Sequence, residues 1–327
     1  MRRSMLKTLA VVTPLILGSL LVAPGSALAV QQGPARTAPA PDLAQEFGRF
    51  LVQTGTALHE TDGTFDFAFD DWDGDGRPDL FAIKKSGTGT GSTEVHVLSG
   101  ASNFRKFILQ TGTALHETDG TFDFDVADHT GDGRPDLVAV KKSRTGTGTT
   151  EVHVLSGGDG FRRFALQTGT ALHETDGTFD FRAADWNGDG RVDLFAIKKS
   201  RTGTGSTEVH VLSGASNFQR FILQTGTALH ETDGTFDFDV AYWNADSRPD
   251  VVAVKKSRTG TGSTEVHVLA GGGYRGFMLQ TGTVLHETDD TFAFGVTDWN
   301  RDGRPDVAAV KKSRTGTGST EVHVLAG

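Results

Sequence analysis

Acidic side chains at alternate positions of a short glycine-rich segment form a potential binding site for a hard cation. The segment begins at Asp71, ends at Asp79 and reads Asp-Trp-Asp-Gly-Asp-Gly-Arg-Pro-Asp. Side-chain oxygens stand at its positions 1, 3, 5 and 9, and its two glycines allow the backbone to turn with positive φ. Because Ca²⁺ takes roughly six to eight oxygen ligands in proteins, we expect these carboxylates and the backbone carbonyl at position 7 to bind calcium.

Four further copies of this loop occur along the chain, with different ligand sets. The third and fifth replace one acid by asparagine, and the second has a threonine at position 3. The fourth begins with Tyr242 and replaces both glycines, by Ala245 and Ser247. Since affinity follows ligand charge and loop geometry, we expect about four calcium sites, the tightest in the first loop. The predicted ligands, with each arginine contributing its carbonyl, are Asp71, Asp73, Asp75, Arg77, Asp79, Asp128, Thr130, Asp132, Arg134, Asp136, Asp185, Asn187, Asp189, Arg191, Asp193, Asp298, Asn300, Asp302, Arg304 and Asp306, and the weak ones are Asn244, Asp246 and Asp250.

The elements around the loop are predicted to be strands, which distinguishes it from an EF-hand. Position 12 of the first copy is Ala82 instead of the glutamate of an EF-hand. Before the loop, Phe65, Phe67 and Phe69 alternate with other residues, a period of two that indicates a strand. A plain Asp-Gly turn is the alternative, but several carboxylates in one loop repel one another without a cation.

The chain consists of repeated units that predict a β-propeller. The phrase Gln-Thr-Gly-Thr recurs at steps of about 57 residues, a period typical of solenoids, propellers and arrays. Each unit predicts four strands, which is the composition of a propeller blade. In the first unit these strands are expected at residues 65–70, 80–85, 93–98 and 104–111.

The two ends of the repeat region predict a closed ring. A lone outer strand comes first, at residues 47–58, and the last unit ends at Gly327 without an outer strand of its own. Pairing the first strand with this last unit completes a fifth blade and removes an open sheet edge. We therefore expect residues 47–327 to form an all-β, five-bladed propeller of four-stranded blades, closed by the N-terminal outer strand. An open β-solenoid is the alternative, with two unpaired edges.

The loop pattern D-x-[DN]-G-D-G-R-x-D-L between two strands, repeated blade by blade, resembles the FG-GAP/VCBS repeat family of β-propellers. That family includes integrin α-subunit head domains and many secreted bacterial proteins. The resemblance covers residues 47–327 and implies a calcium-binding propeller. It implies no single function, because the family includes lectins, lyases, adhesion modules and accessory domains of hydrolases.

The N-terminus has the features of a secretory signal peptide. Basic residues precede an apolar run over residues 9–22, and Ala27-Leu28-Ala29 provides a small-residue cleavage site. A transmembrane anchor is the alternative, but the run is short for a span of about 20 apolar residues. We expect a signal peptide over residues 1–29, a flexible linker over residues 30–46, and a secreted, extracellular monomer that does not insert into membranes.

Composition restricts the class of partner. The formal net charge is −9 and the chain has no cysteine. The acidity lies largely in the loop aspartates, and a nucleic-acid partner would need a basic stripe instead. Without disulfides, we expect an exported ring to be held by its core and by calcium.

A second repeated phrase, Leu-His-Glu-Thr-Asp-Gly-Thr, joins the outer strand of one unit to the inner strand of the next. Five such sets would form five equal polar pockets on one rim, suited to sugar hydroxyls. A structural connector, with an Asp-Gly turn, is the alternative, and a zinc site lacks the usual ligand spacing. The candidate ligand residues are His59, Glu60, Asp62, His116, Glu117, Asp119, His173, Glu174, Asp176, His230, Glu231, Asp233, His286, Glu287 and Asp289.

Three other repeated positions are predicted to be structural. The aromatic residue at loop position 2 is expected to pack between blades rather than to stack on a sugar; it is Trp72, His129, Trp186, Trp243 and Trp299 in the five copies. The histidine of the third strand, His96 in the first unit, is expected to face away from its valine neighbours. The pair Lys84-Lys85 is expected at a solvated strand end.

These features favour a secreted, calcium-binding, multivalent binding module that is lectin-like, with an extracellular glycan or protein as partner. A calcium-stabilised interaction or adhesion scaffold without a small-molecule ligand is the alternative. A polysaccharide-active enzyme is less favoured, because every carboxylate belongs to a repeated motif and no Gly-x-Ser-x-Gly elbow or cysteine nucleophile occurs. We therefore expect no catalytic residue.

Overall fold

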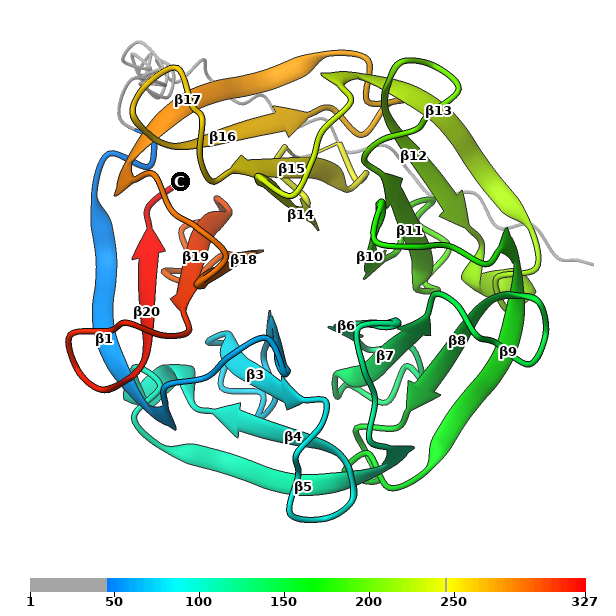
Figure 1. The fold of residues 1–327 in the computed structure, drawn as a ribbon, viewed down its shortest axis with the longest axis horizontal. Coiled ribbons are helices and arrows are strands. Elements are labelled where there is room, and N and C mark those ends of the chain that lie inside the picture. Colours follow the sequence, from blue (N-terminus) through cyan, green and yellow to red (C-terminus); the bar gives the residue numbers. More distant parts are fainter. Residues whose placement is uncertain (1–45, 245) are drawn as a thin grey trace, which may run out of the picture. The chain divides into compact units, whose positions relative to one another are not determined.

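The computed structural model describes residues 46–244 and 246–327, and these residues belong to one compact unit. Within them, five four-stranded antiparallel sheets are arranged around a central axis as the blades of a propeller (Figure 1). The predicted signal peptide and, apart from Glu46, the predicted linker lie outside the described residues. No helix among the described residues is long and apolar enough to span a membrane.

Each of the first four blades contains an inner, two middle and an outer strand in chain order. The strands of the first blade are β2 (Phe65–Asp70), β3 (Asp79–Lys84), β4 (Ser92–Leu98) and β5 (Phe107–His116). The second has β6 (Phe122–Ala127), β7 (Asp136–Lys141), β8 (Thr149–Leu155) and β9 (Phe164–His173). The third has β10 (Phe179–Ala184), β11 (Asp193–Lys198), β12 (Ser206–Leu212) and β13 (Phe221–His230). The fourth has β14 (Phe236–Ala241), β15 (Asp250–Lys255), β16 (Ser263–Leu269) and β17 (Phe277–His286).

The fifth blade confirms the predicted closure of the ring. It contains β18 (Phe292–Thr297), β19 (Asp306–Lys311) and β20 (Ser319–Leu325), and its outer strand is the N-terminal β1 (Phe50–His59). Strand β1 pairs antiparallel with β20, with Thr54 opposite Val322. The two ends of the propeller are thereby joined by backbone hydrogen bonds, and the edge that an open array would expose is paired.

The hydrophobic core is divided into layers between neighbouring blades. Strand β3 is buried on both faces, because Leu80 contacts the fifth-blade side and Phe81 the second-blade side. The other three blade-to-blade junctions have equivalent clusters. This two-sided burial explains the continuous apolar run of the strand, which does not alternate like a surface strand.

The outer strands begin later than the sequence indicated. In the first blade the predicted strand starts at Phe104, whereas β5 starts at Phe107 and continues to His116. Phe104 lies in a turn with φ of 59°, after the short 3₁₀ helix η1 (Gly100–Ser102), and its side chain is fully buried. The equivalent helix in the third blade is η2 (Gly214–Ser216). Phe104 is therefore buried as part of the turn before the outer strand and does not belong to the strand itself.

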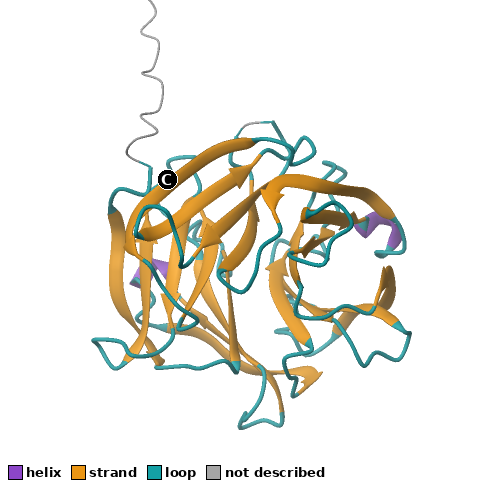
Figure 2. Cartoon of the chain, turned by 45° about the horizontal axis from the view of Figure 1, so that its top comes forward, coloured by secondary structure: helices purple, strands orange, loops and turns teal. Residues whose placement is uncertain are grey.

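Antiparallel pairing places the loops at two ends of the ring (Figure 2). The loops between inner and second strands, such as Asp71–Pro78, share one end with the turns that precede the outer strands; we call it the calcium-loop end. The connectors between blades, such as residues 117–121, share the other end with the loops between the two middle strands; we call it the connector end.

Candidate metal centres and ligand pockets

The first calcium loop gathers three carboxylates. Asp71, Asp73 and Asp79 each offer an oxygen, and these atoms all lie within 4.8 Å of one another. The loop is folded by its own side chains, since the two Asp71 oxygens accept the amide hydrogens of Gly74 at 2.9 Å and Gly76 at 2.6 Å. Both glycines have positive φ, 74° and 79°, which explains why glycine occupies these positions.

Asp79 connects this loop to the blade. Its carboxylate is fully buried and accepts the Trp72 amide at 3.0 Å and the Gly100 amide at 2.7 Å. Burial raises the pKa of Asp79 to about 6 despite these two hydrogen bonds, and Asp73 and Asp75 raise it further. A Cβ at Gly100 would lie 2.1 Å from the Pro78 carbonyl oxygen, so only glycine permits this close approach.

The donor set of the first loop fits calcium. Two oxygens bound to one Ca²⁺ at roughly 2.3–2.6 Å can be no more than about 5 Å apart, and the three carboxylates meet that limit. Asp71, Asp73 and Asp79 would hold the ion, which would supply positive charge to a cluster of acids that otherwise repel one another. Asp75 is turned toward Arg301 of the fifth blade, whose guanidinium is 3.8 Å from its Oδ1.

The other loops keep the fold but gather fewer acids. Among the described residues, only the first loop brings three carboxylates within ligand distance of one another. In the third and fifth loops the asparagine amide donates to a neighbouring acid, from Asn187 to Asp189 at 3.0 Å and from Asn300 to Asp302 at 2.9 Å. The geometry therefore supports one metal centre, and calcium in the second, third and fifth loops stays a prediction.

The fourth loop departs furthest from the pattern. The Tyr242 hydroxyl, which replaces the first acid, donates to the Asp185 carbonyl of the third blade at 3.0 Å. Ser247 stands where the other loops have their second glycine, and it keeps a φ of 65°. The loop thus retains its turn and gains a contact to the neighbouring blade, without the carboxylate at position 1.

The aromatic residues at loop position 2 pack against the next blade. Trp72 is 8% exposed, and its ring centroid is 5.1 Å from that of Phe161 in the second blade. Trp299 is 4% exposed and lies 4.8 Å from Phe104 in the first blade. In the second loop His129 packs on Phe218 at 5.8 Å. This arrangement confirms the predicted packing between blades for these residues.

At the connector end, each repeated aspartate hydrogen-bonds within its own connector, and each repeated glutamate hydrogen-bonds to the loop between the two middle strands. Glu117 Oε1 accepts the amide and hydroxyl of Thr88 at 2.7 and 2.8 Å, and Asp119 Oδ1 accepts those of Thr121 at 2.8 and 2.6 Å. These hydrogen bonds lower the pKa of both carboxyl groups. The adjacent His116 ring is exposed. The same acid pattern recurs in every blade, at Glu60, Asp62, Glu174, Asp176, Glu231, Asp233, Glu287 and Asp289.

A shallow polar pocket adjoins the connector that leads into the fifth blade. It has a volume of about 310 Å³ and is lined by Glu287, Asp289, Phe292, Lys311 and Arg314, together with two threonines. Arg314 Nη1 lies 3.3 Å from Asp289 Oδ2, and Lys311 lies over the Phe292 ring at 5.9 Å. The second, third and fourth blades repeat the Arg–Asp pair at 3.3–3.4 Å. We call the sites of these four Arg–Asp pairs the rim pockets; the first blade has Gly87 in place of the arginine.

The histidines of the third strands lie between polar neighbours. His96 is hydrogen-bonded to Gln110 at 3.4 Å and lies 3.5 Å from Glu94. Burial lowers its pKa, although Glu94 opposes that effect. Val95 and Val97, on the other face of the strand, are fully buried. The histidine thus lies on the opposite face from the valines, as the alternation predicts.

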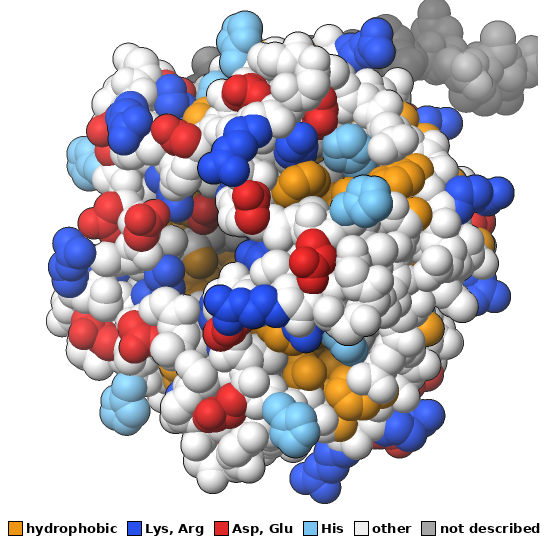
Figure 3. Space-filling view, turned by 45° about the vertical axis from the view of Figure 1, so that its right-hand side comes forward, with side chains coloured by type: hydrophobic (Ala, Val, Ile, Leu, Met, Phe, Trp, Pro, Cys, Tyr) orange, Lys and Arg blue, Asp and Glu red, His pale blue; other side chains and the backbone are white. Residues whose placement is uncertain are grey.

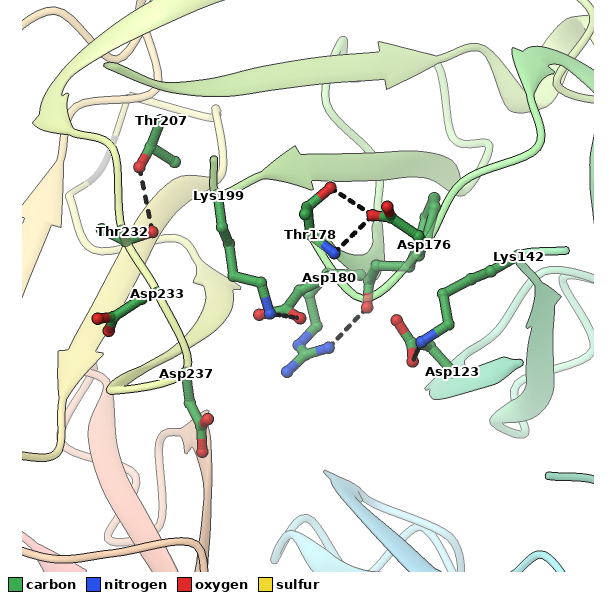
Figure 4. A network of polar contacts seen from close by, with 12 residues as sticks. Asp123, Lys142, Asp176, Thr178, Asp180, Lys199, Thr207, Thr232, Asp233 and Asp237 are labelled. Atoms are coloured by element: carbon green, nitrogen blue, oxygen red, sulfur yellow. Dashed lines mark hydrogen bonds and ion pairs between the residues drawn. The ribbon is translucent and has the colours of Figure 1, made fainter. Parts of the chain in front are cut away.

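The prediction of solvated lysines was wrong for the second lysine of each pair. Lys85 is only 12% exposed and bonds Asp66 of the inner strand at 2.8 Å. Equivalent pairs join Lys142 to Asp123 at 2.6 Å, Lys199 to Asp180 at 2.7 Å and Lys256 to Asp237 at 3.0 Å. Figure 4 shows two of these pairs, Lys142 beside Asp123 and Lys199 beside Asp180, in adjacent blades.

One charged cluster in the channel was missed by the sequence reasoning. Arg182 of the third blade lies 3.4 Å from Asp239 of the fourth, and Asp125 of the second blade also interacts with it. Burial raises the pKa of Asp125 to about 7, although Arg182 opposes that rise. The same strand position is Ala68 in the first blade and Gly295 in the fifth. The sequence does contain a signal for this cluster: this position varies among units that are otherwise nearly identical.

Comparison with known proteins supports the fold. Residues 71–139 match the model of the FG-GAP-like repeat. No curated protein matches the sequence.

Several solved structures are similar in fold. The structure of RS223 β-xylosidase has a TM-score of 0.51 at 12% identity, over 84% of this chain and 94% of that one. The GH43_1 enzyme from Xanthomonas citri complexed with xylose has a TM-score of 0.50 at 13% identity, over 86% and 91%. The catalytic domain of the Coprinopsis cinerea GH62 α-L-arabinofuranosidase has a TM-score of 0.51 at 9% identity, over 86% and 98%. At these identities the likeness extends to the fold alone, and the protein is a five-bladed β-propeller that carries an FG-GAP-like repeat.

Proposed function

We propose that the protein is a secreted, calcium-stabilised propeller that binds extracellular carbohydrate through several equivalent rim pockets, without turning it over. The observation that carries this proposal is the repetition of one set of side chains beside the connector. In four blades the same arginine meets the same connector aspartate at 3.3–3.4 Å, beside a half-buried phenylalanine and a lysine. Aromatic surface beside a few placed polar groups is the usual composition of a small-molecule site.

The hydrogen bonds of the connector define which groups are available to a ligand. Glu287 and Asp289 each use one oxygen to accept two hydrogen bonds from threonines. The second oxygen of Asp289 lies 3.3 Å from Arg314 Nη1, so a ligand would bond to this exposed pair, and the adjacent His286 ring is also exposed. Exposed histidines stand around the edge of the molecule in Figure 3. A pyranose ring offers hydroxyls to such groups, and several pockets on one rim allow multivalent binding.

Calcium acts at the opposite end of the ring in this proposal. The acids of the first loop lie at the calcium-loop end, and the rim pockets lie at the connector end. Calcium therefore stabilises the scaffold and makes no contact with the sugar. Chelation is expected to weaken binding only where it unfolds the protein.

The test is a glycan array probed with the purified protein in calcium and in chelator, below the unfolding temperature of the chelated form. The panel includes xylose- and arabinose-containing glycans, because the similar folds belong to enzymes described as a xylosidase and an arabinofuranosidase. Retained binding of a defined glycan in both buffers supports the proposal. A released sugar product would show turnover and contradict it.

Arginine variants test whether several rim pockets bind glycan at the same time. The fourfold variant R144A/R201A/R258A/R314A is expected to lose about 10²–10⁴-fold in avidity, the range that multivalency provides, whereas R314A alone loses much less. R163A is the matched control, since Arg163 pairs with Asp159 at the calcium-loop end. Binding of the fourfold variant at wild-type avidity would exclude the rim pockets. Binding of no glycan but of one protein partner would favour the interaction scaffold.

A further inference from the structure

The fifth blade lacks an ion pair that the other four blades contribute to the wall of the axial channel. In the other four blades a lysine at the end of the second strand bonds an inner-strand aspartate at 2.6–3.0 Å. The fifth blade keeps the lysine, Lys312, but has Ala293 at the aspartate position. Within the described part of the chain, Lys312 makes no ion pair of this kind.

The fifth blade also carries an extra acid, but that acid meets a different lysine. Asp290 replaces the glycine of the other four connectors. Its Oδ1 lies 3.2 Å from Lys256 Nζ, which already bonds Asp237 at 3.0 Å. One lysine of the channel wall therefore has two carboxylates, and Lys312 lacks the one that its equivalents have.

These residues line an axial cavity at the connector end. It has a volume of about 340 Å³ and is lined by residues of all five blades, including phenylalanines of the inner strands. Lys312, Ala293 and Asp290 border it together with the acids Asp66, Asp123, Asp180 and Asp237 and the cations Arg182 and Lys256. This volume lies in the range of about 300–1,000 Å³ that small-molecule sites occupy. Figure 3 shows a hollow in this side of the molecule, with basic and acidic side chains around it.

Lys312 needs a counter-charge here. Its side chain is half-buried. Burial and the nearby Lys256 ammonium lower its pKa, although Asp237, Asp66 and Asp290 act in the opposite sense. Removing an ammonium group from water is costly unless an anion bonds to it. The other blades show that a single carboxylate at the Ala293 position supplies that bond.

We propose that this cavity is a binding site for one carboxylate group of a small acid, which takes the place of the missing aspartate and bonds Lys312. The ligand is singly charged because five aspartates border the cavity and repel further negative charge; they are Asp66, Asp123, Asp180, Asp237 and Asp290. A sugar acid and a simple organic acid both present this chemistry. The site occurs once per molecule and is separate from the rim pockets.

The experiment is calorimetric titration of the purified protein with D-galacturonate, D-galactose, acetate and sulfate in parallel. Galacturonate is expected to bind with one site per molecule, and galactose and sulfate are expected not to bind there. Acetate that binds as tightly as galacturonate assigns the site to simple acids, and much weaker acetate assigns it to sugar acids. Equal binding of galactose, or tighter binding of sulfate, overturns the proposal.

Two variants locate the site. A293D introduces the residue of the other four blades, so it is expected to fold, to pair with Lys312 internally and to weaken galacturonate at least about tenfold, as loss of a charge-assisted hydrogen bond implies. K312M is expected to cause a similar loss. K106M is the control, because Lys106 is exposed in a turn at the calcium-loop end. Unchanged affinity in A293D overturns the proposal even if K312M fails to fold.

A gain-of-function variant gives an independent check. D66A removes the partner of Lys85 and gives the first blade the same alanine as the fifth. It is expected to raise the stoichiometry from one carboxylate to two. The fourfold rim variant is expected to keep galacturonate binding, so failure of the rim pockets and failure of the channel site are distinguishable.

Discussion

The two ends of the ring use aspartate and glutamate in opposite ways. At the connector end, Glu117 and Asp119 are exposed, accept two hydrogen bonds each, and have lowered pKa values. At the calcium-loop end, Asp79 also accepts two hydrogen bonds, but burial raises its pKa to about 6. Two hydrogen bonds accompany a raised pKa in one case and a lowered pKa in the other. The reason is that burial removes water from around the Asp79 charge, and this destabilises the charged form more than two amide donors stabilise it.

The comparison indicates which end depends on a cation. The connector acids receive their hydrogen bonds from threonines, in the connector itself for Asp119 and in the loop between the two middle strands for Glu117. In the first calcium loop Asp71 and Asp73 lie beside the buried Asp79, and positive charge would reduce their mutual repulsion. The four predictions that follow test this difference, starting with the largest expected effect.

Removing the buried acid should cost the most stability. D79A deletes the acceptor of the Trp72 and Gly100 amides and leaves both buried. We expect a loss of about 2–4 kcal/mol in the free energy of unfolding, from about 1–3 kcal/mol per unsatisfied buried group. Urea denaturation measures it. E117A, at the exposed end, is the control and should lose far less; equal losses would remove the distinction between the two ends.

Calcium should stabilise the protein through the first loop. At a concentration of 100 times the dissociation constant, one bound ion adds about 2.7 kcal/mol to the stability of the folded state. We expect Tm to rise with calcium and the rise to shrink in D71N, which removes a charge from the loop. D119N, in a connector, should keep the full calcium response. A Tm that does not depend on calcium in the wild type would contradict a metal centre.

A glycine at position 247 of the fourth loop should stabilise the protein. Ser247 has a φ of 65°, a region that L-residues other than glycine rarely adopt. S247G is expected to stabilise the protein by a few tenths of a kcal/mol to about 1 kcal/mol, because it relieves this strain. The reciprocal change G190A, at a φ of 78° in the third loop, should destabilise by a similar amount. Thermal melts of the two variants should therefore shift in opposite directions.

The smallest effect concerns the titration of a connector acid. The Thr88 amide and hydroxyl lower the pKa of Glu117 below its usual 4.5. Because the folded-state pKa is lowered, the contribution to stability is present above pH 4.5 and is lost as the pH falls through the lower folded value. NMR titration should show the pKa of Glu117 rising toward 4.5 in T88V, which removes the hydroxyl. No change would mean that the amide alone causes the shift.

The sequence predicted the ring well, because the patterns that indicate strands and blades are local in the chain and repeated. The alternation at Phe65, Phe67 and Phe69 predicted an inner strand, and that strand is β2. The lone first strand and the incomplete last unit predicted the pairing of β1 with β20. For the site, the pattern of the first loop identified Asp71, Asp73 and Asp79, which do gather.

The channel could not be predicted in the same way. Lys85 looked like a solvated strand end, because its partner Asp66 lies on another strand and only the curvature of the blade turns both toward the axis. Arg182 and Asp239 come from different blades and meet only when the ring is closed. In the connectors, the sequence left open whether Glu117 and Asp119 bind a ligand, and the structure shows the hydrogen bonds that they make.

What the sequence by itself determined is the number of blades, their strands, the closure of the ring and the acids of the first loop. These depend on residues that are neighbours in the chain or equivalent in the repeat. Only the tertiary structure decided which charges face water and which face the axis. Lys312 and Ala293 illustrate the reason. Units that are nearly identical have nearly identical local sequences, but whether a charge is paired depends on the side chains that other strands place beside it.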